Sequence, residues 1–199
     1  MEKIIKYAPH KFEAYGEEEI QAVVDCLRTG WLTEYGGTRV KEFEEKIAKK
    51  FGKKYGVFVN SGSSANMLAL ACLKLPKNSE VITPACTFST TLAPIIQLGL
   101  KPVFVDVGLN TYVPHFWDVV EAITPNTKAI IIPNLIGNKP NWSGIKQLLK
   151  AKGREDIILI EDSADTITFT DESDISTTSF YASHIITAGG SGGMVMFNN

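Results

Sequence analysis

Residues 60–66, with the sequence Asn-Ser-Gly-Ser-Ser-Ala-Asn, have the composition of a turn that binds an anion. Gly62 permits a tight backbone between a predicted strand and a predicted helix. The backbone amides of Ser63, Ser64 and Ala65 would then point outward from the helix N-terminus, where the macrodipole favours a phosphate. A serine N-cap beside a glycine turn needs the same residues without any ligand, so this segment alone leaves both interpretations open.

Acidic residues follow a second apolar run, in residues 160–166 (Ile-Glu-Asp-Ser-Ala-Asp-Thr). Ligands bind outside the carboxyl ends of the strands in open α/β sheets. A buried carboxylate at Asp162 could keep a pyridinium nitrogen protonated, and so make a bound aromatic ring an electron sink. A solvent-exposed aspartate that caps the next helix is the alternative interpretation.

Two residues with ring side chains add further chemistry. Phe88 follows another predicted strand and could stack on a flat ring, although an aromatic side chain there is more often part of the core. His184 lies five residues after Ser179 and carries an imidazole, which exchanges a proton near neutral pH. His10 and His115 have no partner at the spacing of metal ligands, and the sequence predicts no metal site.

Short apolar runs alternate with amphipathic segments along the chain. Strands separated by helices are typical of parallel βαβ units, so the pattern predicts an α/β domain. Pro94 falls within one predicted helix, where it either lies in the first turn or bends the helix. Helices are expected at residues 17–29, 40–51, 64–75, 90–98, 117–123 and 145–152, and strands at 55–60 (buried), 80–83, 101–107, 129–133, 157–161, 175–180 and 193–197.

Length and composition limit the classes of protein. The 199 residues suffice for one sizeable domain and are too few for two large ones. A net charge of −2, with 44% hydrophobic and 21% charged residues, gives no electrostatic bias toward nucleic acid or an anionic membrane. No apolar stretch is long enough to span a bilayer, and the N-terminus lacks the apolar core of a secretory signal. Three cysteines without CxxC spacing favour reduced thiols in a cytoplasmic protein.

The chain is expected to form one large domain over residues 1–199, which includes an N-terminal helical arm in residues 1–30. Residues 194–197 (Met-Val-Met-Phe) form an apolar strand that only two asparagines follow. Because a domain rarely ends on a core strand without a covering element, we expect the sequence to come from a truncated open reading frame or to be a fragment.

These segments together are far more specific than any one of them. The order of phosphate turn, aromatic residue, strand-end aspartate and Ser-Phe-x-x-x-His resembles the DegT/DnrJ/EryC1/StrS family, the fold-type I sugar aminotransferases and their dehydratase relatives. The resemblance runs from about Tyr7 to the last residue, and residues 30–33 (Gly-Trp-Leu-Thr) match the family's early glycine-rich substrate loop. It implies a three-layer α/β/α fold with a mostly parallel central sheet, the large domain of a transferase dependent on pyridoxal 5'-phosphate (PLP).

The resemblance also implies roles for the residues around this cofactor. The turn and the Ser179 hydroxyl would bind its phosphate, Phe88 would stack on the pyridine ring, and Asp162 would pair with the ring nitrogen. The residues that it implies in cofactor binding are Gly62, Ser63, Ser64, Phe88, Asp162, Asp165 and Ser179.

His184 stands where the family usually carries a lysine that forms a Schiff base with PLP. One small branch, the NDP-4-keto-6-deoxyhexose 3-dehydratases, carries histidine there, and residues 161–166 and 174–181 are more similar to this branch. Its members use pyridoxamine 5'-phosphate (PMP), whose amine condenses with the 4-keto group of a nucleotide-linked sugar. A base then removes a proton from C4' of the cofactor and the 3-hydroxyl leaves, which implies that His184 is the catalytic base. A sugar aminotransferase and a non-catalytic remnant stay open as alternatives.

The sequence departs from the family pattern in two places. Some of these dehydratases carry an iron–sulfur cluster, and its first cysteine would fall at Ala164, which cannot ligate iron. Residues 166–173 are shorter than the family's usual glycine-rich hairpin. The resemblance further implies a homodimer that binds a nucleotide-sugar substrate between its subunits, and a C-terminal small domain that these 199 residues lack.

Overall fold

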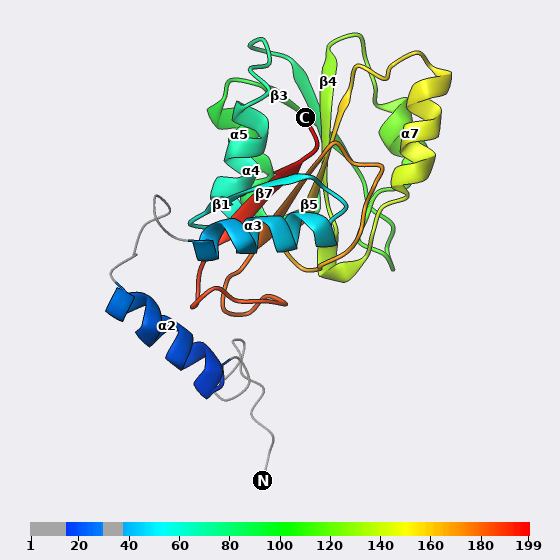
Figure 1. The fold of residues 1–199 in the computed structure, drawn as a ribbon. Helices are drawn as coiled ribbons and strands as arrows, with labels where there is room; N and C mark the ends of the chain where they lie inside the picture. Colours follow the sequence, from blue (N-terminus) through cyan, green and yellow to red (C-terminus); the bar gives the residue numbers. More distant parts are fainter. Residues whose placement is uncertain (1–14, 30–37) are drawn as a thin grey trace.

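The computed structural model describes residues 15–29 and 38–199, and its centre is a seven-stranded sheet (Figure 1). The strand order is β1-β7-β6-β5-β4-β2-β3, and every neighbouring pair is parallel except the two pairs that β7 makes with β1 and β6. The predicted mostly parallel sheet is therefore confirmed. The strands are β1 (Tyr55–Val59), β2 (Glu80–Pro84), β3 (Lys101–Val105), β4 (Thr127–Pro133), β5 (Ile158–Ser163), β6 (Ile175–Ser179) and β7 (Gly193–Phe197).

Helices cover both faces of this sheet and give the predicted three layers. One apolar cluster joins α4 and α5 to one face, and a second joins α6 and α7 to the other. A third cluster packs α3 against β7 on the second face, where α3 crosses the sheet in Figure 1. The helices are α2 (Glu17–Thr29), α3 (Thr38–Lys50), α4 (Gly62–Ala71), α5 (Ser89–Gln97), α6 (Phe116–Glu121), α7 (Trp142–Ala151) and the short 3₁₀ turn η1 (Leu135–Gly137).

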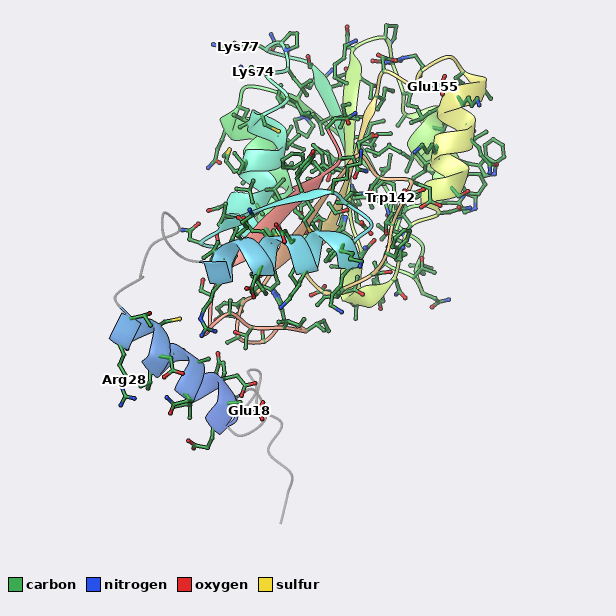
Figure 2. The ribbon with its side chains drawn as sticks, in the orientation of Figure 1. Glu18, Arg28, Lys74, Lys77, Trp142 and Glu155 are labelled. Atoms are coloured by element: carbon green, nitrogen blue, oxygen red, sulfur yellow. The ribbon has the colours of Figure 1, made fainter. Side chains whose placement is uncertain are left out.

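The side chains of consecutive residues in the central strands pack on opposite faces of the sheet. In β4, Ala129 and Ile131 belong to the cluster under α4 and α5, whereas Ile130 and Ile132 belong to the cluster under α6 and α7. Because both faces are covered, these strands consist of continuous apolar runs. Trp142 closes the second cluster from the N-terminus of α7, on the side of that helix that faces the sheet (Figure 2).

Three expectations need correction or fall outside the described residues. Strand β1, predicted to be buried, is half exposed because it is an edge strand with β7 as its only neighbour in the described sheet. Pro94 is the sixth residue of α5, not part of its first turn. Helix α2 of the expected arm is present but buries none of its residues, and residues 1–14 and 30–33 lie outside the described part.

The sheet brings the chemically interesting residues to one edge. Strands β1 to β6 run in the same direction, so the turns after β1, β2, β4, β5 and β6 lie at a common carboxyl edge, together with the start of antiparallel β7.

No helix in residues 15–29 and 38–199 is long and apolar enough to cross a membrane.

Candidate active site

A pocket of about 370 Å³ lies at the carboxyl edge of the sheet. Seven of the eight residues singled out in the sequence line it, and only Ser64 does not. The seven lie at or just after the carboxyl ends of four different strands, β1, β2, β5 and β6: Gly62, Ser63, Phe88, Asp162, Asp165, Ser179 and His184. The structure therefore brings together residues that are up to 122 positions apart (184 minus 62).

Asp162 forms the floor of this pocket as the fifth residue of β5. Only 6% of it is exposed, and its Oδ2 accepts hydrogen bonds of 2.8 Å from Asn66 Nδ2 and of 2.8 Å from Thr91 Oγ1. Burial raises the pKa of the Asp162 carboxyl above its ordinary 3.8, while these two hydrogen bonds act in the opposite direction. The arrangement suits a carboxylate that receives a cation from the pocket, because a paired positive charge would favour its ionised form.

The turn after β1 is built around the N-cap of α4. The Ser61 side chain accepts a hydrogen bond from the Ser64 amide at 3.1 Å, and the Ser61 carbonyl accepts one from the Ala65 amide at 3.0 Å. The expectation that three consecutive amides are open to an anion is therefore wrong for Ser64 and Ala65, since local capping uses them. Ser61, Gly62 and Ser63 of this turn line the pocket, whereas Ser64 and Ala65 do not.

Gly62 lies directly against Ser179 of β6. A Cβ atom at Gly62 would lie 2.7 Å from the Ser179 Cβ atom and 3.3 Å from its hydroxyl oxygen. The missing side chain thus allows the turn and the Ser179 hydroxyl to reach the same wall of the pocket. This wall offers a helix N-terminus and a hydroxyl group to an anion.

His184 ends a short turn on the wall next to Ser179. Its backbone amide donates to the Tyr181 carbonyl at 2.9 Å, and its ring meets the Tyr181 ring edge-on with centroids 5.9 Å apart. Nδ1 of the half-buried imidazole is shielded from solvent and has no hydrogen-bond partner in the described part of the chain. Among the residues that the structure describes, those that line the pocket include this imidazole and no lysine.

Phe88 stands at the rim, at the N-cap of α5. Its backbone is extended and 67% of the residue is exposed, in contrast to the alternative that it belongs to the core. An aromatic face open to the pocket can receive a flat ring by stacking.

Asp165 lines the pocket but already has a partner in the protein. Its Oδ2 accepts the backbone amide of Ile136 at 3.0 Å. Ile136 adopts the left-handed conformation, with φ 56° and ψ 28°, which is unusual for a branched side chain. Asp165 thus holds the η1 turn at the mouth of the pocket.

Residues 166–173 pack back on the protein. Thr170 and Ser173 are buried, and their carbonyls both accept hydrogen bonds of 2.6 Å from Lys53 Nζ. Lys53 itself is only 5% exposed, and burial lowers the pKa of its ammonium group, with the nearby Glu161 acting in the opposite direction.

Several pocket residues were missed in the sequence. Asn66 lies one turn after Gly62 on α4, and a polar residue within that apolar helix is the signal that it faces a polar site. Thr91 and Asn134 carry no comparable signal, because their importance depends on the strands and helices that bring them beside Asp162.

In residues 15–29 and 38–199, no cluster of three or more His, Cys, Asp or Glu side chains could hold a metal ion.

Comparison with known proteins agrees with this arrangement. A model of the DegT/DnrJ/EryC1/StrS aminotransferase family matches residues 13–199. The chain belongs to this family. GDP-4-keto-6-deoxy-D-mannose 3-dehydratase of Escherichia coli O55:H7 is 40% identical over 196 residues, which cover 92% of this chain and 49% of that protein. The chain thus spans about half the length of the curated relatives it matches.

Solved relatives share the fold and hold the predicted cofactor in its two forms. The E. coli GDP-4-keto-6-deoxy-D-mannose-3-dehydratase with bound hydrated PLP has a TM-score of 0.84 and 35% identity, covering 97% of this chain and 51% of that chain. NtdA from Bacillus subtilis, solved with bound PMP, has a TM-score of 0.85 and 28% identity, covering 98% and 45%. Other solved structures similar to this chain are aminotransferases. The likeness therefore establishes the family but does not decide between dehydratase and aminotransferase activity.

Proposed function

We propose that the chain is a PMP-dependent 3-dehydratase of a nucleotide-linked 4-keto-6-deoxyhexose, or the N-terminal part of such an enzyme. The observation that carries this proposal is the presence of His184, and of no lysine, among the described residues that line the Asp162 pocket. A lysine is needed to tether an aldehyde cofactor as a Schiff base, whereas an imidazole cannot form that bond but can exchange a proton near neutral pH.

The residues present fit PMP. The buried Asp162 carboxylate, whose pKa burial raises, would pair with a protonated ring nitrogen. The exposed face of Phe88 could cover the ring, and the wall of Gly62, Ser63 and Ser179 could receive the phosphate. The unpartnered Nδ1 of His184 is a further polar atom that a ligand in this pocket could satisfy.

When bound, PMP supplies a primary amine and an aromatic ring that withdraws electrons. Asp162 would hold the proton on the ring nitrogen, and Asn66 and Thr91 would hold the carboxylate in place. His184 would take up and return a proton at C4' of the cofactor, next to the amine. General acid–base assistance of this kind contributes about 10²–10⁴-fold to a rate.

The proposed substrate class is supported by the names of the relatives rather than by contacts in this chain. The E. coli relative is named for its action on GDP-4-keto-6-deoxy-D-mannose, and a relative from Saccharopolyspora spinosa for its action on dTDP-4-dehydro-2,6-dideoxy-D-glucose. Both names describe a 4-keto sugar that carries a nucleotide. We further propose that a homodimer completes the sugar side of the pocket, where Phe88 and Tyr181 are exposed.

Two alternatives make different predictions. A sugar aminotransferase would have to bind PLP without the tethering lysine. A non-catalytic remnant would retain PMP weakly or not at all, and would not release the 3-hydroxyl at any concentration of sugar nucleotide.

Titration with PLP, borohydride trapping and peptide mapping test the proposal. We expect PMP to bind with near-ultraviolet absorbance, and PLP to give no visible absorbance band and no borohydride-trapped adduct in the pocket. A His184→Lys variant is the positive control and should give a trapped adduct at position 184. A trapped adduct on a pocket peptide of the unmodified chain, or failure to bind PMP, would overturn the proposal.

A further inference from the structure

Asn134 is the first residue after β4 and lies beside Asp162 at the carboxyl edge of the sheet. The register pairs Pro133 with Asp162, and the backbone amide of Asn134 donates to the Asp162 carbonyl at 2.8 Å. Asn134 is 1% exposed and lines the same pocket as Asp162. It is therefore fixed in the floor of the pocket, next to the carboxylate.

The orientation of the Asn134 amide is determined by its partners. Nδ2 donates to Glu161 Oε1 at 2.7 Å and to the Ser163 hydroxyl oxygen at 2.6 Å. A rotated amide would place Oδ1 against the Glu161 carboxylate, where two acceptors would repel each other. Oδ1 is consequently the atom left over, and it is buried without a hydrogen-bond partner among the described residues.

Glu161 is what enforces this orientation. It is fully buried and accepts hydrogen bonds from Thr170 Oγ1 at 2.7 Å and Ser176 Oγ at 2.8 Å, in addition to the bond from Asn134. Oε1 of Glu161 accepts from both Thr170 and Asn134, so the Asn134 group that faces it is the NH2 donor. Glu161 thus positions Asn134 without lining the pocket itself.

We infer that Asn134 Oδ1 accepts a hydrogen bond from a hydroxyl group of the ligand in the Asp162 pocket, with Glu161 as the positioning residue. A buried acceptor without a partner is costly, and a neutral amide oxygen suits a neutral O–H donor rather than an anion. This inference rests on the proposed function, because it needs a ligand in that pocket.

The topology indicates which hydroxyl group this is. Strand β5, with Asp162, lies between β4, with Asn134, and β6, with Ser179. If the ring nitrogen of the cofactor paired with Asp162 and its phosphate lay on the Ser179 side, the opposite edge of the ring would face β4. In PMP that edge carries the ring hydroxyl, and a sugar hydroxyl is the second possible source.

Binding measurements on the 199-residue chain distinguish these sources. PMP and an analogue that lacks the ring hydroxyl are titrated into the unmodified chain and into Asn134→Ala. Asn138→Ala is the matched control, because Asn138 follows on the same loop, does not line the pocket and donates to the Thr111 carbonyl. The thermal midpoints of all three proteins establish that they are folded.

The unmodified chain and Asn138→Ala should prefer PMP over the analogue by about 2- to 12-fold, and Asn134→Ala should lose this preference. If Asn134→Ala keeps the preference but binds a 4-keto-6-deoxy sugar nucleotide less tightly in its PMP-loaded form, the sugar supplies the hydroxyl. If a folded Asn134→Ala variant keeps both the preference for PMP and the affinity for the sugar nucleotide, the inference about Asn134 is wrong. The proposed function is not affected by that result. If Asn134→Ala does not fold, equal affinity of the unmodified chain for PMP and for the analogue rules out the ring hydroxyl. Failure of the unmodified chain to bind PMP would overturn the proposed function as well.

Glu161→Gln tests the positioning role. The side-chain oxygen of the introduced glutamine can still accept from Asn134, and its amide can donate to the Ser173 or Ser176 hydroxyl oxygens, so the preference for PMP should survive. In Glu161→Leu, which removes the acceptor, the preference should fall toward that of Asn134→Ala. A full preference in a folded Glu161→Leu variant would contradict the positioning role.

Discussion

Asn66 Nδ2 lies 2.8 Å from Asp162 Oδ2, although 96 residues separate them in the sequence. This contact joins helix α4, which follows the turn after β1, to the central strand β5. Thr177 Oγ1 donates to Asn66 Oδ1 at 2.6 Å, so the amide is held from both sides and its orientation is fixed. The carboxylate at the floor of the pocket therefore belongs to a buried polar network, which makes its charge state sensitive to each partner.

Replacing Asp162 by asparagine should alter both stability and cofactor binding. Because burial raises the Asp162 pKa, the folded, ligand-free protein retains a proton that the unfolded chain releases above its ordinary pKa of 3.8. The free energy of unfolding of the unmodified chain, relative to Asp162→Asn, should thus fall as pH rises through the window above 3.8. Denaturant titrations across that window measure it, and parallel pH profiles would contradict the raised pKa.

The same variant should bind PMP far less tightly. Removing one partner of a buried charge pair costs about 3–5 kcal/mol, so we expect the dissociation constant for PMP to rise by at least about 100-fold. Asp118→Asn is the matched control, because Asp118 is exposed on α6 and does not line the pocket. Equal losses in the two variants would contradict a specific role for Asp162.

Removing the Thr91 hydroxyl should raise the Asp162 pKa further. A hydrogen bond to a charged group contributes about 1.5–3 kcal/mol, so Thr91→Val should weaken PMP binding by about 10- to 150-fold and shift its pH profile upward. Thr91→Ser should restore most of the affinity. Thr83→Val is the control, since Thr83 is also fully buried but its hydroxyl has no partner among the described residues. An unshifted pH profile in Thr91→Val would count against this coupling.

A methyl group at Gly62 should separate the phosphate turn from β6. The new Cβ would lie 2.7 Å from the Ser179 Cβ, and neither group can move without its backbone. We expect Gly62→Ala to lower the free energy of unfolding by about 1–3 kcal/mol and to weaken PMP binding. Gly16→Ala should be neutral, because its nearest contact is the flexible end of Glu19 at 3.3 Å. A stable Gly62→Ala protein with normal PMP affinity would contradict the close approach.

The buried Lys53 ammonium should anchor residues 166–173. Lys53→Met would leave two buried carbonyls without donors, at a cost of about 2–4 kcal/mol of stability. Since burial lowers the Lys53 pKa below its ordinary 10.5, the unfolded chain holds more protons just below that value. The stability of the unmodified chain should therefore rise relative to Lys53→Met as pH increases through this alkaline window. Chemical unfolding of Lys53→Met and of the exposed neighbour Lys54→Met at several pH values measures the loss of stability and its pH dependence. Equal free energies of unfolding for the two variants would contradict the stabilising role of Lys53.

The sequence predicts the order of helices and strands because each depends on local periodicity. Short apolar runs such as residues 129–133 become strands buried on both faces, and the amphipathic run at residues 17–29 becomes α2 with the same bounds. The half-exposed state of β1 could not be predicted, since it depends on which strand becomes its neighbour. The pairing of β1 with β7 joins segments about 140 residues apart, and no pattern within either segment predicts it.

Asp162 was singled out at the carboxyl end of an apolar strand, and His184 through the resemblance to the family. Both line the pocket, while their chemical roles stay predictions. Ser64 does not line the pocket, because its amide is used by the local cap. Asn134 could not be singled out, because the orientation of its side chain depends on the neighbouring Glu161. Such roles arise from contacts across strands, which no spacing in a single sequence encodes.

Proton exchange at the cofactor is the most direct test of the role of His184. The PMP-loaded protein is placed in heavy water with GDP-4-keto-6-deoxymannose, and deuterium at C4' of the recovered cofactor is measured by mass spectrometry. The unmodified protein should incorporate deuterium, while His184→Asn should bind PMP equally well and incorporate it at least about 100-fold more slowly. Incorporation at an undiminished rate in His184→Asn would contradict the assignment of the imidazole as the group that moves this proton.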